Sequence, residues 1–282
     1  MLKIFQGNIM FGSSRKKLIA IGCSYTNYAR HSTHWPEFLA EHLDMEVVNL
    51  GGPGQGNSYM FSILQDVLML NKIINSWPKR TEFNIKNEDI GLVVIMWSEF
   101  QRMDFESKRF WLAFHPHRNN WKHEQYPMEK AGRDVMVQWN NVFSATLLSM
   151  RHFHLSQLLL KDIPYIFVQG TKPTHSYSTD LIPEQYVNRS SYNRDGDVSF
   201  ERISSKAMMN SNYFDLIDDK KFLGWPIHRE IGGFCIDDIL NKLDPDQRKY
   251  RVGNNDTHPN REGHKVIASK LYEEYKKIYT KN

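Results

Sequence analysis

Leu18-Ile19-Ala20-Ile21-Gly22 (L-I-A-I-G), followed at once by Cys23-Ser24, is the stretch that decides the fold class. A short apolar run that ends in glycine is typical of a buried strand in a parallel sheet. Ser24 therefore lies just past the carboxyl end of the first predicted strand. Cys23 shares that buried setting, where a reduced thiol behaves as a small apolar side chain.

The rest of the chain alternates further apolar runs with segments of helical spacing. Strands are predicted at Met45–Leu50, Asp89–Trp97 and Ile163–Gln169, and helices at Trp35–Leu43, Ser58–Trp77, Val135–Leu160 and Arg261–Tyr279. This alternation predicts an α/β fold, a three-layer α/β/α sandwich with a central parallel sheet. Ligands bind at the carboxyl ends of such strands. Ser24, the glycine-rich loop Gly51–Asn57 and the segment after Trp97 all fall there.

Two long segments do not follow the alternation. Residues 98–134, approximately, are rich in aromatic residues, histidine and arginine, and residues 171–253 are long and polar. Short helices are predicted in the second segment near Ser204–Asp215 and at Ile236–Leu243. Because structureless loops of this length are uncommon in compact domains, we interpret both as insertions that decorate one domain. That domain is predicted to span 17–282, after an N-terminal arm of residues 1–16.

Composition narrows the classes of partner. The net charge is +4, from 36 basic and 32 acidic residues, which is too balanced to argue for a nucleic-acid partner, and we expect none. No stretch is long and apolar enough for a membrane span, and the first residues lack the order of a signal peptide. The two cysteines, Cys23 and Cys235, have no spacing that demands a disulfide.

A second polar segment stands just before the last predicted helix, where the sequence reads Asn255-Asp256-Thr257-His258-Pro259-Asn260 (N-D-T-H-P-N). It offers a carboxylate and an imidazole, and Ser24 offers a hydroxyl. Nucleophilic catalysis by serine needs these three groups together. A parallel sheet places the exit of the first strand and the entrance of the last helix at one edge, so we expect the three groups to meet.

Taken together, these motifs resemble those of the SGNH/GDSL hydrolase family, in a divergent form similar to that of bacteriophage proteins. Gly22-Cys23-Ser24 corresponds to the family's G-x-S block, with cysteine in place of the usual aspartate. Asn49 and the glycine-rich turn after it correspond to the second block, and the segment ending in His258-Pro259-Asn260 to the last. The resemblance covers nearly the whole chain, from Lys17 to Tyr279, and implies a flavodoxin-like three-layer fold.

The resemblance also implies roles for single residues. Ser24 would be the nucleophile, His258 the general base and Asp256 the acid that orients the imidazole. The N–H groups of Ser24 and Gly54 would form the oxyanion hole. The implied activity is that of an esterase that forms an acyl-enzyme without metal or cofactor, on a small-molecule or carbohydrate ester such as an O-acylated sugar.

The sequence departs from the family pattern at two places. Glu99 of Trp97-Ser98-Glu99 stands where the family has an asparagine that donates to the oxyanion, and an ionised carboxylate would repel that charge. Either Asn57 or Ser98 supplies a donor instead, or activity is impaired. Asn57 has a second interpretation, as a cap of the following helix. The strict family spacing would also place Asn255, not Asp256, in the acid position.

These departures leave a second hypothesis open, a catalytically impaired SGNH fold that serves as a structural or binding component, for instance in a viral assembly. The insertions would then offer surfaces for a homo-oligomer or for assembly contacts. The expected location is cytoplasmic or virion-associated. His115, His117 and His123 lie in one insertion, but their spacing matches no known ligand pattern, so we expect no metal site.

Overall fold

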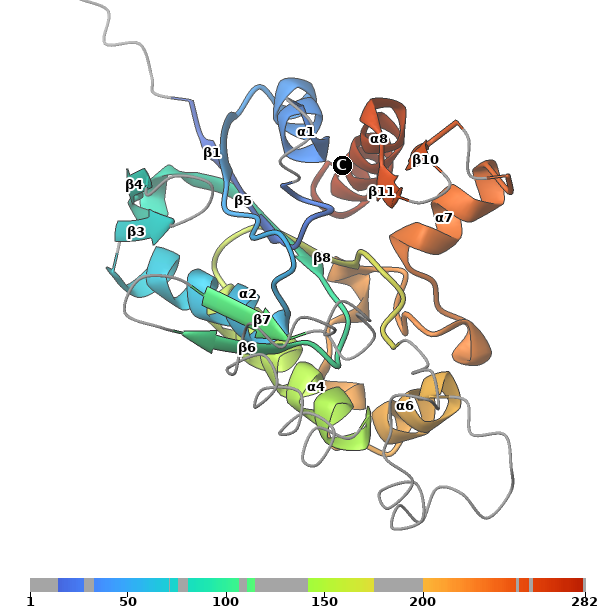
Figure 1. Cartoon of the computed structure of the whole chain (residues 1–282). Coiled ribbons are helices and arrows are strands. Elements are labelled where there is room, and N and C mark those ends of the chain that lie inside the picture. Colours follow the sequence, from blue (N-terminus) through green and yellow to red (C-terminus); the bar gives the residue numbers. More distant parts are fainter. Residues whose placement is uncertain are drawn as a thin grey trace, which may run out of the picture.

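The computed structural model describes residues 15–27, 33–70, 72–75, 81–106, 111–114, 142–174, 200–246, 249–253 and 256–280 (Figure 1). Its centre is a five-stranded sheet in the order β2-β1-β5-β8-β9, in which every neighbouring pair is parallel. The strands are β1 (Lys17–Gly22), β2 (Glu46–Asn49), β5 (Ile90–Trp97), β8 (Tyr165–Gln169) and β9 (Phe222–Leu223). Renumbered within the sheet, this is the 2-1-3-4-5 order of flavodoxin-like folds.

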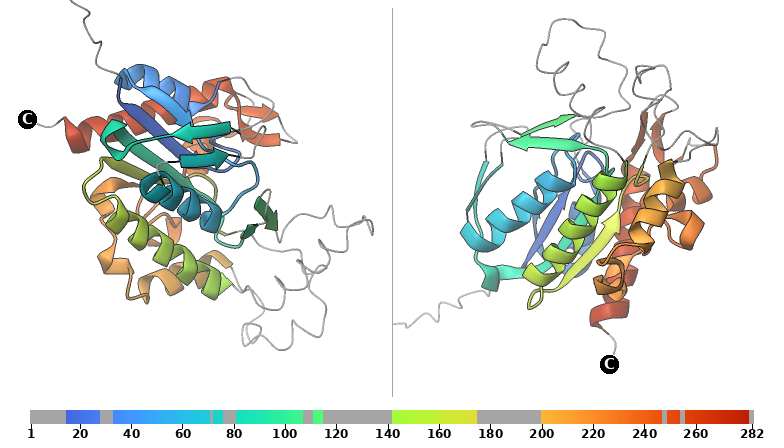
Figure 2. Two further views of the ribbon diagram at one scale, coloured as in Figure 1. Left: turned by 90° about the vertical axis from the view of Figure 1, so that its left-hand side faces the viewer. Right: turned by 90° about the horizontal axis from the view of Figure 1, so that it is seen from below.

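Helices cover both faces of the sheet, so the predicted three-layer α/β/α sandwich is confirmed (Figure 2). One face carries α1 (Trp35–Leu43) and α8 (Arg261–Tyr279), which pack against each other. The other face carries α2 (Asn57–Gln65) and α4 (Val142–Leu159). Two further helices, α6 (Phe200–Met209) and α7 (Ile236–Leu243), pack against α4 and α8 respectively.

The core lies along the central strands. Leu18–Ile21 of β1, Leu92–Trp97 of β5 and Ile166–Val168 of β8 are all 0% exposed. Strands covered on both faces bury both sets of side chains, which is why these segments read as continuous apolar runs without polar alternation. Cys23 and Cys235 are both buried, free thiols.

The predicted helix Ser58–Trp77 is wrong in its second half. Helix α2 ends at Gln65, a π-helical turn covers Asp66–Leu70, and Lys72–Asn75 then forms strand β3, which pairs antiparallel with β4 (Thr81–Asn84). The two adjacent β-branched residues in K-I-I-N favour a strand, and the hairpin partner supplies the hydrogen bonds. Helical spacing alone did not reveal that partner.

The two segments that we interpreted as insertions hold elements that the sequence did not predict. The longer one contributes β9 to the central sheet, and the shorter one contains the hairpin of β6 (Met103–Glu106) and β7 (Trp111–Phe114). A third hairpin joins β10 (Arg251–Gly253) to β11 (Asp256–Pro259). Short 3-10 turns lie at Asn87–Asp89, Phe214–Leu216, Asp219–Lys221 and Arg229–Ile231.

Other predictions agree with the structure or cannot be compared with it. The helices Trp35–Leu43, Ile236–Leu243 and Arg261–Tyr279 are confirmed to the residue, while the one predicted near Ser204–Asp215 begins earlier, at Phe200. Residues 1–14 of the predicted arm and residues 115–141 and 175–199 lie outside the described residues. Within the described parts, no helix is long and apolar enough to cross a membrane.

Candidate active site

Ser24 sits in a tight turn that follows β1. The carbonyl of Cys23 accepts hydrogen bonds from the N–H groups of Thr26 (2.9 Å) and Asn27 (3.1 Å), which closes the turn around Ser24. The residue is 8% exposed. The Ser24 hydroxyl therefore lies at the carboxyl end of β1, which is an inner strand of the sheet between β2 and β5.

His258 and Asp256 lie on β11, immediately before α8. Asn260 caps that helix, because its side chain accepts from the N–H of Gly263 (3.0 Å) and donates to the carbonyls of Lys249 and Arg251, both at 2.9 Å. One asparagine thus fixes the start of α8 and the hairpin that carries His258.

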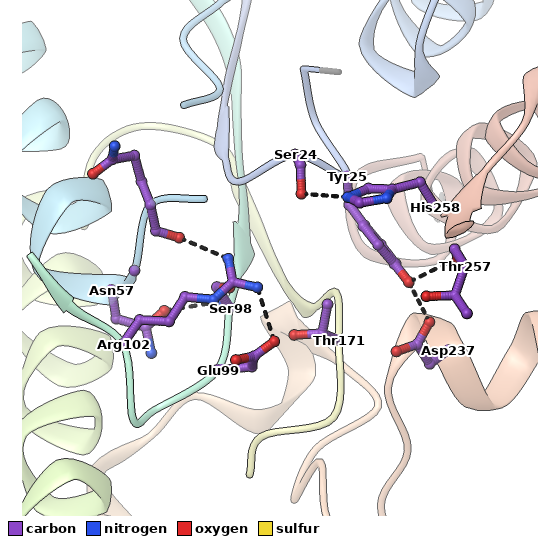
Figure 3. Close-up of polar contacts among 12 residues, drawn as sticks. Ser24, Tyr25, Asn57, Ser98, Glu99, Arg102, Thr171, Asp237, Thr257 and His258 are labelled. Atoms are coloured by element: carbon purple, nitrogen blue, oxygen red, sulfur yellow. Dashed lines mark hydrogen bonds and ion pairs between the residues drawn. The ribbon is translucent and has the colours of Figure 1, made fainter. Parts of the chain in front are cut away.

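The three predicted side chains form one chain of hydrogen bonds (Figure 3 shows the Ser24–His258 contact). Nε2 of His258 is 2.8 Å from Oγ of Ser24, and Nδ1 of His258 is 2.6 Å from Oδ1 of Asp256. The same Asp256 oxygen accepts from the backbone N–H of His258 at 3.2 Å. Asp256 therefore contacts both the imidazole and the backbone of His258.

A second polar network lies behind the imidazole. The hydroxyl of Tyr25 donates to Asp237 of α7 at 2.7 Å, and Arg251 contacts the Tyr25 hydroxyl (3.0 Å), the Asp237 carboxylate (2.9 Å) and the carbonyl of Thr257 (2.8 Å). Burial, with the charge of Asp237, raises the pKa of Tyr25 well above its usual value. The network links the neighbours of Ser24 and of His258, because Tyr25 follows Ser24 and Thr257 precedes His258.

The glycine-rich loop contains a β-turn with Pro53 and Gly54 at its centre. The N–H of Gln55 bonds the carbonyl of Gly52 at 3.0 Å, and Gly54 has φ = 80°. Proline followed by a left-handed glycine is the pattern of a type II turn, and only glycine takes that conformation without strain. Neither the N–H of Gly54 nor that of Ser24 takes part in a hydrogen bond within the described part of the chain.

Asn49 joins this loop to the turn of Ser24. Its side chain donates to the carbonyl of Thr26 at 2.9 Å and accepts from the N–H of Gly51 at 3.0 Å. The N–H of Gly52 also bonds the carbonyl of Gly22 at 2.8 Å. The two segments that carry the N–H groups of Ser24 and Gly54 are therefore tied to each other beside β1 and β2.

The interpretation of Asn57 as the cap of the following helix is wrong. Gly56 is the residue that precedes α2, and the Asn57 side chain is buried, accepting from the N–H of Ser98 (2.9 Å) and donating to Ser149 of α4 (3.0 Å). Since the amide bonds both partners inside the protein, Asn57 joins the loop, the end of β5 and α4. Ser98 is likewise buried, with its N–H committed to Asn57.

Glu99 forms a buried ion pair. Its Oε1 accepts from Nη2 of Arg102 at 2.8 Å, and the two side chains are 4% and 7% exposed (Figure 3). A positive charge thus balances the carboxylate that the sequence places in the asparagine position. Nearby, burial raises the pKa of Asp104 to about 6, against the opposing effect of hydrogen bonds from the N–H groups of Tyr59 and Gly56.

Some residues considered from the sequence cannot be placed. Asn255, the other candidate for the acid, and His115, His117 and His123 lie outside the described residues. Within those that are described, no group of three or more His, Cys, Asp or Glu side chains is arranged to hold a metal ion. Trp97 at the end of β5 is 0% exposed and packs against Phe153 and Phe167.

Five polar residues close to the site were not found from the sequence. Tyr25 follows Ser24 directly and Arg102 lies three residues after Glu99, so closeness to a motif in the sequence could have pointed to both. Asp104, Asp237 and Arg251 lie on β6, α7 and β10, and no local sequence pattern predicts how these elements pack.

Comparisons with known proteins return fold-level likenesses only. No family model matches the chain, and no curated protein matches it. Similar solved structures include a member of the lipolytic protein G-D-S-L family from Veillonella parvula (11% identity, TM-score 0.41, covering 95% of this chain and 100% of that one). Another is an acetylxylan esterase from Geobacillus stearothermophilus (13% identity, TM-score 0.41, covering 93% of this chain and 94% of that one). A third is a lipase/acylhydrolase from Enterococcus faecalis (10% identity, TM-score 0.42, covering 93% of this chain and 96% of that one).

The Veillonella parvula protein is described as a member of the family that the sequence motifs resemble. At such identities and TM-scores, however, the function has to be argued from this chain's own residues.

Proposed function

We propose that this protein is a serine esterase that hydrolyses ester bonds through an acyl-enzyme, with Ser24, His258 and Asp256 as its catalytic triad. The observation that carries the proposal is the continuous chain of contacts, 2.8 Å from Ser24 to His258 and 2.6 Å from His258 to Asp256. Nucleophile, base and acid in this order are the arrangement that activates a serine hydroxyl.

The reaction would proceed in two halves. Oγ of Ser24 attacks the carbonyl carbon of the ester while Nε2 of His258 takes the hydroxyl proton. The tetrahedral intermediate collapses, the bond to the alcohol oxygen breaks, and His258 returns the proton to the leaving alcohol. Water then attacks the acyl-enzyme with His258 again as base, which releases the acid and restores the Ser24 hydroxyl.

The intermediate carries an oxyanion, for which we propose two backbone donors, the N–H groups of Ser24 and Gly54. Support comes from their position on two segments that Asn49 ties together and from the absence of other hydrogen bonds to them within the described residues. Backbone donors already fixed in place stabilise the developing charge without reorganisation. Glu99 does not oppose this role as a lone charge, because Arg102 is paired with it.

For the substrate we propose small acyl esters, with O-acetylated carbohydrates as the first class to test. Trp111 is only partly buried and packs edge-on against Tyr59 beside the glycine-rich loop, with ring centroids 5.6 Å apart. An aromatic surface next to a catalytic loop suits the apolar face of a sugar ring.

The direct test is turnover of p-nitrophenyl acetate by the purified chain. Replacement of Ser24 by alanine removes the nucleophile, so Ser24→Ala should lose turnover by on the order of 10⁴-fold or more while the fold persists by circular dichroism. Ser144→Ala, on the exposed face of α4, is the matched control and should keep wild-type turnover. Equal turnover by Ser24→Ala and wild type would eliminate the nucleophile assignment. A wild-type protein inert toward esters would favour the non-catalytic alternative, a structural or binding protein.

A further inference from the structure

One peptide group in the glycine-rich loop is held from both sides. Nη1 of Arg102 donates to the carbonyl of Gln55 at 3.1 Å, and Oδ1 of Asp104 accepts from the N–H of Gly56 at 2.6 Å. That carbonyl and that N–H belong to the same peptide unit. Two side chains two residues apart therefore fix both ends of its dipole.

The two side chains that hold this peptide are themselves fixed. Glu99 binds the other arm of the Arg102 guanidinium at 2.8 Å, and Oδ2 of Asp104 accepts from the N–H of Tyr59 in the first turn of α2 at 2.9 Å. A Cβ on Gly56 would come within 2.7 Å of Cβ of Arg102, so the close approach requires glycine there. Charge-assisted hydrogen bonds of this kind are the strong ones in a buried setting.

The held peptide follows the type II turn directly. The N–H of Gln55 closes that turn on Gly52, and Gly54 lies between them. On the other side, Asn49 and the carbonyl of Gly22 bind the N–H groups of Gly51 and Gly52. Because both ends of the turn are fixed, the direction of the Gly54 N–H is fixed as well.

We propose that Arg102 and Asp104 are positioning residues that aim the N–H of Gly54 at the oxyanion, with Glu99 acting through Arg102. The proposal rests on the esterase function proposed above. It gives the carboxylate in the asparagine position a structural role, because Glu99 orients the arginine that holds the donor loop and does not itself contact the oxyanion.

The first test separates positioning from substrate binding. The variants are Arg102→Met, which removes the donor to Gln55, and Asp104→Asn, which removes one of two carboxylate acceptors. Both should lower kcat by about 10- to 100-fold with KM unchanged, because displacement of a transition-state donor by about 1 Å costs rate without loss of ground-state binding. Arg15→Met, at an exposed arginine paired with Asp44, is the matched control and should keep both constants.

The second test reads the oxyanion itself. A trifluoromethyl ketone labelled with ¹³C at its carbonyl adds to a serine nucleophile, and the ¹³C shift of the adduct reports the pKa of the resulting hemiketal hydroxyl. A misdirected donor stabilises the hemiketal anion less, so Arg102→Met should raise that pKa relative to wild type. Arg102→Lys keeps a cation beside Glu99 but lacks the planar fork that binds two partners, so its kcat should lie between those of wild type and Arg102→Met.

Each result bears on the positioning role alone once wild-type esterase activity is established. Unchanged kcat and an unchanged hemiketal pKa in Arg102→Met and Asp104→Asn would overturn that role while leaving the esterase assignment intact. If Arg102→Met does not fold, Arg102→Lys decides: wild-type kcat and hemiketal pKa in that variant would contradict the positioning role.

Discussion

Asp256 contacts His258 twice, through the ring nitrogen and through the backbone N–H. The backbone contact holds the loop, and the ring contact places the Nδ1 proton on the side of the acid, which leaves Nε2 to accept from Ser24. A variant that keeps the shape of the Asp256 side chain but removes its charge distinguishes the role of the backbone contact from that of the ring contact.

Asp256→Asn should therefore lower kcat on p-nitrophenyl acetate by on the order of 10³- to 10⁴-fold, because an amide can no longer stabilise the imidazolium and can hold the wrong tautomer. Its thermal midpoint should remain close to that of wild type, since the amide oxygen can still accept from the His258 N–H. Asp215→Asn, at an exposed aspartate, is the matched control. Full activity in Asp256→Asn would reject Asp256 as the acid.

For single residues, short motifs predicted which side chains would lie close together, but not which hydrogen-bond partners the residues around them would have. Ser24, His258 and Asp256 could be picked out because each stands in a local pattern at a strand end or a helix start. The contacts of Asn57 and Glu99 could not, because their partners Ser149 and Arg102 are set by packing of α4 and by the path of the chain after β5.

Hydrogen bonds among Tyr25, Asp237 and Arg251 connect helix α7 to the hairpin of β10 and β11. Arg251 is 3% exposed and binds the carboxylate of Asp237 and the carbonyl of Thr257, one residue from His258. Removal of the arginine leaves a mostly buried carboxylate without its cation, a change that typically destabilises by about 3–5 kcal/mol.

Arg251→Met should consequently lower the free energy of unfolding by about 3 kcal/mol or more in urea denaturation. It should also reduce kcat, because the hairpin that carries His258 loses its support. The double variant Arg251→Met with Asp237→Asn removes the orphaned charge and should recover part of that stability. A double variant no more stable than the single one would show that the ion pair is not the source of the loss.

The elements themselves were predicted unevenly. Helices α1, α7 and α8 carry regular apolar spacing over their full length and were predicted to the residue. The hairpin β3–β4 and strand β9 were missed because a strand of two to four residues depends on its partner, which lies elsewhere in the chain.

Across the whole molecule, buried histidines make the fold sensitive to acid. Burial lowers the pKa of His152 and of His228 from 6.5 to about 4. Each contributes stability that is present above pH 6.5 and is lost as the pH falls toward 4, because the unfolded chain then binds protons that the fold does not. Two carboxyl groups act in the opposite direction, because burial raises the pKa of Asp104 to about 6 and also raises the pKa of Asp66, so that protonation of either group favours the fold.

His152 stacks on Phe61 with ring centroids 5.0 Å apart, so phenylalanine fits the position in shape. The free energy of unfolding, measured by urea denaturation, should fall between about pH 7 and pH 5 in both proteins. That fall should be about 2 kcal/mol smaller in His152→Phe than in wild type. Parallel losses in the two proteins would mean that His152 does not charge on unfolding in that range.

The proposed mechanism depends above all on Ser24 being an activated nucleophile, and covalent labelling by a fluorophosphonate measures this directly. Peptide mass spectrometry of the labelled wild-type protein should find the adduct on Ser24, and His258→Ala should slow its formation by several orders of magnitude because the base is gone. A wild-type protein that stays unlabelled, or one labelled at another serine, would contradict the mechanism.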